Sequence, residues 1–212
     1  MKKSLLLFFC LVCCRALMAQ TVGPLIQTQW NQSAPYNSMC PEVDGVHCLA
    51  SCGAAAMAQI CYYYRWPEHG SGTGSWHIKG QGGDDQWHTP DLSGDYYDYD
   101  KMLLTYDENS SEEAIQAVAL LMRDVAYSGA VFYTDESGSP SYSTLVKNFS
   151  YDCSLMFLPE GYFSQDDLVS IIRSELDAGR PVLLGGSNGS VGHAFICDGY
   201  NDQGEFHFNY GW

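Results

Sequence analysis

The run of residues 52–65, CGAAAMAQICYYYR, constrains the fold of this chain more than any other segment. It contains no proline, and small residues fill its first turns from Gly53 to Ala56. Alanine is the best helix former, and a helix without bulky side chains can be buried on all sides. The run stops at Trp66-Pro67, because the residue before a proline disfavours the helical conformation. The sequence therefore predicts a buried central helix that begins at Cys52.

Three more helices are expected downstream. Ser110 and Glu113 are three residues apart, as in a capping box, and begin an apolar run with helical spacing that predicts a helix over 110–129. A similar signal predicts a helix over 164–179, and a shorter helix is expected around 143–149.

The last part of the chain has a different pattern. Residues 181–184, 193–197 and 205–210 are short, rich in aromatic or β-branched residues and separated by Gly and Asn turns, so they predict antiparallel strands. Residues 21–47 and 69–98 are expected to be extended or looped. Helices followed by strands indicate an α+β fold with a helical part and a sheet part, and a cleft between two such parts is a common place for a binding site.

The N-terminus predicts export. Lys2 and Lys3 precede the apolar run 5–14, which is too short to cross a bilayer comfortably, and small residues follow it. We therefore expect residues 1–19 to be a signal peptide and residues 20–212 to be one exported domain, which is secreted, periplasmic or on the cell surface. The alternative is an N-terminal membrane anchor.

Charge and cysteine content narrow the possible partners. The 212 residues include 25 acids and only 10 Lys and Arg, a formal net charge of -15, so nucleic acid and anionic membrane surfaces are poor partners. Six of the nine cysteines lie beyond residue 19, with no spacing typical of a zinc ribbon or a disulfide framework. Disulfides and free thiols are both possible among Cys40, Cys48, Cys52, Cys61, Cys153 and Cys197.

Cys52 is the strongest candidate for a nucleophile. A thiol at a helix N-terminus forms the thiolate more readily, and the neighbouring N–H groups can stabilise an oxyanion. The alternative is that Cys52 is a small buried apolar residue. His193 follows about 140 residues later at the start of a predicted strand, a separation found in papain-like enzymes, although a histidine there can also be structural. Asn209, at the end of the next strand, is expected beside the imidazole, where its amide would fix the tautomer.

Four ordered blocks of the sequence resemble the streptopain family of papain-like bacterial cysteine peptidases. They are WNQSAPYN at 30–37, CGAAAMAQI at 52–60, GHAF at 192–195 with Asp198-Gly199, and FHFNYGW at 206–212. The resemblance implies a papain-like two-part fold with Cys52 as the nucleophile and His193 as the general base and acid. It also makes the Gln32 side chain a donor of the oxyanion hole. The implied substrates are proteins with a large apolar side chain beside the scissile residue, in a pocket lined by Gly192 and the loop that contains Ser137.

The chain also departs from the family. Tyr210 stands where members usually have a Trp that shields the histidine, and Ser51 and Gly53 replace the more usual Gly and Val around the nucleophile. Few residues separate the expected signal from the first block, whereas members usually carry a long inhibitory prosegment. The chain stops at Trp212, where members continue with further strands. We therefore expect a truncated catalytic core.

The predicted function is a secreted cysteine endopeptidase acting on proteins or peptides through an acyl-enzyme. One alternative is a weak or silent peptide-binding or adhesion module on the same fold, and another is a thiol amidase or acyl-transfer enzyme. His69, His77 and His88 lack metal-ligand spacing, so no metal and no cofactor are expected. The acidic and Tyr-rich run 95–100 is expected to be a solvated loop. No membrane partner is expected once the signal is removed, and the sequence leaves the oligomeric state open.

Overall fold

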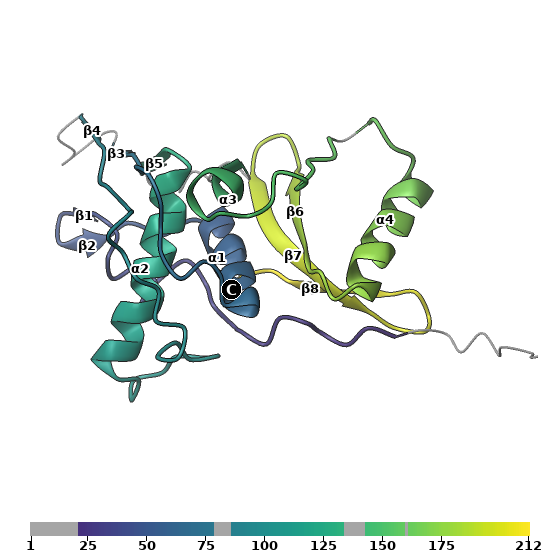
Figure 1. The fold of residues 1–212 in the computed structure, drawn as a ribbon, viewed down its shortest axis with the longest axis horizontal. Coiled ribbons are helices and arrows are strands. Elements are labelled where there is room, and N and C mark those ends of the chain that lie inside the picture. Colours follow the sequence, from purple (N-terminus) through teal and green to yellow (C-terminus); the bar gives the residue numbers. More distant parts are fainter. Residues whose placement is uncertain (1–20, 79–85, 134–142, 160) are drawn as a thin grey trace, which may run out of the picture.

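The computed structural model describes residues 21–78, 86–133, 143–159 and 161–212. It has two parts that lie side by side (Figure 1). The helical part contains α1 (Cys52–Tyr64), α2 (Glu112–Ser128) and α3 (Ser143–Asn148). The sheet part contains α4 (Gln165–Asp177), β6 (Val182–Ser187), β7 (Gly192–Tyr200) and β8 (Phe206–Asn209). The arrangement is α+β, as the sequence predicts.

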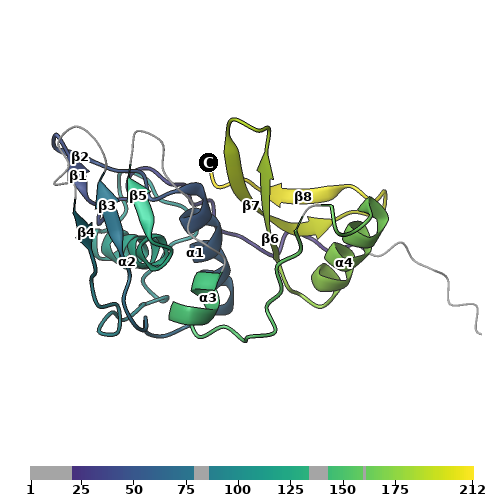
Figure 2. The same ribbon diagram turned by 90° about the horizontal axis from the view of Figure 1, so that it is seen from above.

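Helix α1 lies on the side of the helical part that faces the sheet part (Figure 2), and it packs against both α2 and β7. Its residues from Gly53 to Cys61 are all buried, because Gly and Ala let neighbouring elements approach from every side. The helix begins at Cys52, as predicted, and ends where Arg65 adopts a left-handed conformation with φ of 51°. The nucleophile candidate is thus carried by the most enclosed element of the fold.

The three C-terminal strands form one antiparallel sheet in the order β6-β7-β8. Each predicted strand is present, and β6 and β7 extend further than the apolar pattern indicates. Helix α4 packs against this sheet. The pairing of β7 with β8 has a register shift between Cys197 and Gly199.

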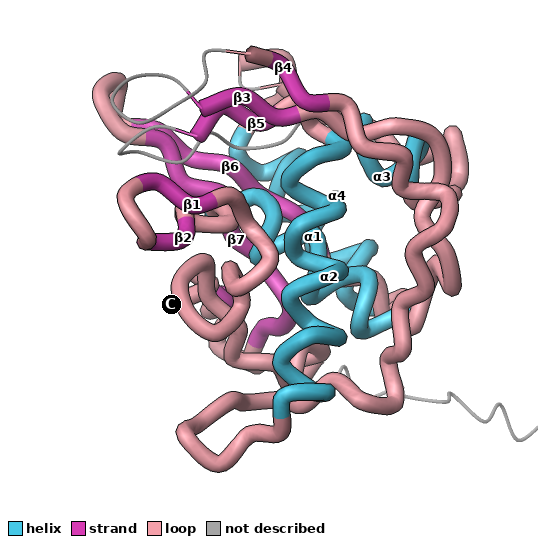
Figure 3. The backbone as a smooth tube through the Cα atoms, turned by 90° about the vertical axis from the view of Figure 1, so that its left-hand side faces the viewer, coloured by secondary structure: helices cyan, strands magenta, loops and turns pink. Residues whose placement is uncertain are grey.

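Five short strands were not predicted. In the helical part, β3 (Trp76–Ile78) pairs in parallel with β5 (Val131–Tyr133) and antiparallel with β4 (Trp87–His88), and Figure 3 shows them along one edge. A hairpin joins β1 (Glu42–Val43) to β2 (Val46–His47). Strands of two or three residues are too short for an alternating pattern, so the sequence suggests only extended or looped segments there.

The helix caps agree with the sequence at one position and differ at another. The capping box of Ser164 and Asp167 is present at the start of α4. The cap of α2 is Ser111, whose side chain accepts from the N–H of Ala114, rather than the predicted Ser110. Ser110 is used one turn earlier, because its hydroxyl accepts from the N–H of Asp107 at 2.9 Å.

The N-terminal segment connects the two parts. Val22 forms an antiparallel bridge with Tyr200 at the end of β7, and the chain then crosses to the helical part (Figure 1). There Trp30 is completely buried, and its indole N–H donates to the backbone oxygen of Leu103 at 2.8 Å. Among the described helices, none is long and apolar enough to cross a membrane.

A buried carboxylate joins α2 to the preceding segment. Asp124 is fully buried and accepts from the Tyr97 hydroxyl at 2.9 Å and from Arg123 Nε at 2.8 Å. Arg123 also donates to Asp95 at 2.7 Å. Tyr97 and Tyr99 are buried, so the prediction that the run 95–100 is a solvated loop is wrong. These two tyrosines alternate with exposed or half-buried residues and complete the core.

We expect Asp124 to make stability depend on pH. Burial raises its pKa to about 7, although Arg123 acts in the opposite direction. Between about pH 4 and pH 7 the folded protein then keeps a proton that the unfolded chain has lost. Its contribution to the free energy of unfolding is complete below about pH 4 and is lost as pH rises through about 7, on the order of 4 kcal/mol in total.

Urea unfolding of Asp124→Asn at pH 5 and pH 8 tests this expectation. The asparagine cannot ionise, so the variant should lose less stability between the two pH values than the unmodified chain does. The exposed Asp202 supplies the control, since Asp202→Asn should leave the difference unchanged. Equal pH dependence in all three proteins would contradict the role of Asp124.

Candidate active site

Cys52 lies at the first position of α1, where the free N–H groups and the helix dipole favour a negative charge. The N-cap is Ser51, which is fully buried and whose side chain accepts from the N–H of Ala54 at 3.1 Å. Ser51 has a φ of 93° and ψ of 150°, a conformation that favours glycine. This backbone is consistent with the glycine that the resemblance leads us to expect at this position, and the capping bond offsets part of the strain that serine introduces.

The sheet part brings His193 to this helix end. Ala194, the next residue on β7, donates its N–H to the Sγ atom of Cys52 at 3.4 Å. The Nε2 atom of His193 lies 2.8 Å from the backbone oxygen of Tyr210. A carbonyl oxygen only accepts, so Nε2 carries the proton of the neutral ring. The lone pair of Nδ1 is then available as a base.

The aromatic ring that covers the imidazole belongs to Trp212 and not to Tyr210, the residue singled out in the sequence. Trp212 stacks on His193 with the ring centroids 4.1 Å apart and an interplanar angle of 29°. Tyr210 lies farther from the histidine, at 6.4 Å, and stacks on Trp212 at 5.7 Å. Although Tyr210 stands where family members usually have a Trp, the imidazole still has a large stacked ring, that of Trp212.

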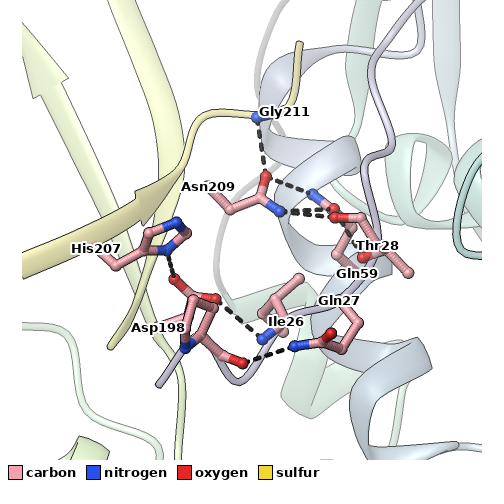
Figure 4. Close-up of polar contacts among 9 residues, drawn as sticks. Ile26, Gln27, Thr28, Gln59, Asp198, His207, Asn209 and Gly211 are labelled. Atoms are coloured by element: carbon pink, nitrogen blue, oxygen red, sulfur yellow. Dashed lines mark hydrogen bonds and ion pairs between the residues drawn. The ribbon is translucent and has the colours of Figure 1, made fainter. Parts of the chain in front are cut away.

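The side chain of Asn209 hydrogen-bonds to groups other than the imidazole, unlike the predicted arrangement. Its side-chain N–H group donates to the backbone oxygen of Thr28 at 2.9 Å and to Gln59 Oε1 at 3.1 Å (Figure 4). Its Oδ1 atom accepts from Gln59 Nε2 at 3.3 Å and from the N–H of Gly211 at 3.1 Å. The hydrogen bond to the ring comes from the next residue, Tyr210, through its carbonyl. Asn209 thus holds the turn that carries this carbonyl.

Gln59 was not identified from the sequence. Its side chain is almost completely buried in α1, and Oε1 also accepts from the hydroxyl of Thr28 at 2.8 Å. It joins the central helix, the N-terminal segment and the end of β8 in one hydrogen-bond network. A glutamine in an otherwise apolar helical run was the only available signal, because its partners are distant in the chain.

The remaining predicted site residues are Gln32, Gly192 and Ser137. The backbone oxygen of Gln32 accepts from the N–H of Ala50 at 2.9 Å, which holds this segment two residues before Cys52. Gly192 is exposed and pairs with Ser187 at the start of β7. Ser137 lies outside the described residues.

A second polar network holds the N-terminal segment against β7. Asp198 is completely buried and accepts from the N–H of Ile26 at 3.0 Å and from His207 Nδ1 at 2.6 Å (Figure 4). Next to it, a Cβ atom on Gly199 would lie 2.7 Å from the backbone oxygen of Val22, so the close approach requires glycine. His207 is therefore a hydrogen-bond partner of Asp198.

Most other thiols are poor nucleophiles. Burial raises the pKa of Cys40 and Cys197 to about 11 and that of Cys61 to about 12. Cys153 is exposed in a turn. A thiol attacks as the thiolate, so the raised pKa values make Cys40, Cys61 and Cys197 poor candidates for the nucleophile of the site. Within the described residues, no group of three or more His, Cys, Asp or Glu side chains is arranged to hold a metal ion.

A buried helix that begins with a cysteine and packs against an antiparallel sheet that carries a histidine is typical of the papain-like class of proteins. The chain belongs to the peptidase C10 family, whose model matches residues 30–212. It is 32% identical over 209 residues to the thiol protease/hemagglutinin PrtT of Porphyromonas gingivalis, covering 92% of this chain and 24% of that protein. It is 30% identical over 202 residues to streptopain of Streptococcus pyogenes serotype M1, covering 86% of this chain and 50% of streptopain.

Solved structures agree with this assignment. The fold is similar to a fragment of Prevotella intermedia prointerpain A, with a TM-score of 0.82 and 28% identity over 92% of this chain and 63% of that one. It is also similar to active interpain A, a cysteine protease, with a TM-score of 0.79 and 28% identity over 92% and 83% of the two chains. The matched region is 24% of the length of PrtT and 50% of the length of streptopain.

Proposed function

We propose that the chain is a cysteine endopeptidase that hydrolyses peptide bonds in proteins. The proposal rests on the contact between the Ala194 N–H and the Cys52 sulfur, together with a His193 ring anchored through Nε2. In the proposed mechanism, Nδ1 of His193 is the base that takes the proton of the thiol. PrtT is named a thiol protease and interpain A a cysteine protease, and both names support the same chemistry.

The reaction would proceed in two steps. The Cys52 thiol gives its proton to Nδ1 of His193, and the thiolate that results attacks the peptide carbonyl. The developing oxyanion accepts hydrogen bonds from the N–H of Cys52 and the Gln32 side chain. His193 then gives its proton to the leaving amine, and an acyl-enzyme forms. Water attacks the acyl group as His193 takes up a proton, which releases the carboxylic acid product and restores the thiol.

The organisation of the chain completes the proposal. Residues 1–19 would direct export, and residues 20–212 would form the catalytic domain. A large apolar substrate side chain would lie near Gly192 and Ser137. Protein substrates are the expected partners, without a cofactor or metal.

Labelling with a peptidyl chloromethyl ketone tests this function. We expect the reagent to modify Cys52 in the folded chain in preference to Cys153, as shown by peptide mapping, and we expect casein to be degraded. Absence of selective labelling in a sample that melts cooperatively would instead favour a binding or adhesion module. Labelling of Cys52 with hydrolysis of small amides, but not of casein, would indicate an amidase.

Trp212 should contribute to catalysis without binding the scissile bond. Stacked aromatic rings contribute about 0.5 to 1.5 kcal/mol, and loss of the ring allows the imidazole to move. We therefore expect Trp212→Ala to lower kcat for a peptide roughly 3- to 10-fold. Trp212→Phe should restore most of the rate, and Trp66→Ala, which removes an exposed indole from the far end of α1, should have no effect. Equal kcat for Trp212→Ala and the unmodified chain would contradict this role.

A further inference from the structure

Two cysteines lie at the base of the β1–β2 hairpin, one on each side. Cys40 precedes β1, and Cys48 follows β2. The antiparallel register pairs Glu42 with His47, and the next bond outward joins the N–H of Cys48 to the backbone oxygen of Pro41 at 2.8 Å. Cys40 is therefore the direct neighbour of the residue to which Cys48 is hydrogen-bonded.

Additional hydrogen bonds hold the two sides together. The backbone oxygen of Asn37 accepts from the N–H of Cys40 at 2.8 Å, while its side-chain amide donates to the backbone oxygen of Cys48 at 3.0 Å. The Nδ1 atom of His47 lies 2.7 Å from the backbone oxygen of Cys40. Asn37 is itself buried, so these bonds are shielded from water. The backbones at Cys40 and Cys48 are thus fixed near each other.

The two thiols also share one environment. Both belong to the main core cluster, which contains Tyr127 and Tyr133, with Cys40 buried and Cys48 half-buried. Burial raises the pKa of Cys40, and a negative charge on Cys48 adds to this rise, as expected for neighbouring groups. Cys52 follows Cys48 by four residues, and its sulfur accepts from the N–H of Ala194 in the sheet part.

We propose that Cys40 and Cys48 are a site of oxidative modification, forming a disulfide with each other that keeps Cys48 from reacting with Cys52. In an exported protein an oxidant is available as a small or protein disulfide. The more exposed thiol, Cys48, attacks one sulfur of that disulfide and releases one thiol. Cys40 then attacks the sulfur of Cys48 and releases the second thiol. The pair loses two electrons and two protons, and the oxidant gains them as two thiols. This inference does not depend on peptidase activity.

Disulfide mapping of the full chain tests the proposal. The chain is equilibrated with mixtures of reduced and oxidised glutathione, alkylated, digested without reduction and analysed by mass spectrometry. We expect a linked peptide that joins Cys40 to Cys48 to form at glutathione ratios where Cys153 is still mainly a free thiol. The same linked peptide should form in Cys52→Ala, which removes the competing nucleophile. Cys48 left free, bound to glutathione or joined to Cys52 at these ratios would overturn the proposal.

Two variants provide independent measurements. Oxidation should raise the melting temperature of the unmodified chain by about 5 °C, because a closed loop reduces the freedom of the unfolded state, and it should not do so in Cys48→Ser. In Cys40→Ala, Cys48 loses its partner, so labelling of Cys52 by the chloromethyl ketone should become dependent on added reductant. A melting temperature that is equal in the oxidised and reduced forms of the unmodified chain would count against the bond.

Discussion

Cys52→Ala and His193→Ala should each lower kcat/KM for a peptide substrate by a factor on the order of 10⁴ or more. Cys52 supplies the electron pair for the new bond, and His193 holds the proton that the leaving amine requires. Either substitution inactivates the same pair, Cys52 and His193. The double variant should therefore be almost as active as either single one, because the effects of residues that act together are not additive.

Matched controls separate this result from a general loss of structure. Cys153→Ala removes an exposed thiol and His69→Ala an exposed imidazole, and both variants should keep nearly full activity. All four variants should melt close to the unmodified chain, because neither Cys52 nor His193 is a fully buried core residue. A His193→Ala variant that retains more than about one tenth of the rate would disprove the proposed base.

The elements that carry the reactive residues are predictable because their signals are local. The Ala-rich run after Cys52 specifies a buried helix from composition alone, and the strand with His193 follows from its apolar residues between glycines. The order of the sequence blocks then predicts that both residues belong to one site. These predictions require no knowledge of how distant segments pack.

The contacts that orient His193 were not predictable in the same way. The acceptor of its Nε2–H group is a backbone carbonyl, that of Tyr210, and every residue has such a carbonyl. Asn209 was expected at the ring, but its amide is taken by Gln59 and Thr28, which are far away in the chain. Hydrogen bonds between distant residues leave no periodic pattern. Only the polar type of these residues, in apolar surroundings, indicates that they have partners.

The second large effect is expected at Gln59, which never approaches the substrate. Gln59→Leu keeps the approximate size of the side chain but removes bonds to Thr28, to Asn209 and to the N–H of Trp30. Each buried group left without a partner costs about 1 to 3 kcal/mol, so we expect a loss of about 4 kcal/mol in the free energy of unfolding. Denaturant unfolding measures this loss directly.

The same change should also reduce catalysis in the protein that remains folded. Asn209 would no longer be fixed, and the Tyr210 carbonyl that orients His193 follows directly after it. A displacement of about 1 Å in a catalytic group can cost about 100-fold in rate. We expect kcat to fall about 100-fold, with KM within about twofold, at a temperature well below the melting point. Gln27→Leu, at an exposed position of the N-terminal segment, should change neither stability nor kcat. If Gln59→Leu is less stable but keeps its full kcat, the network supports the fold alone, and the orientation of the imidazole depends on Trp212 and the sheet.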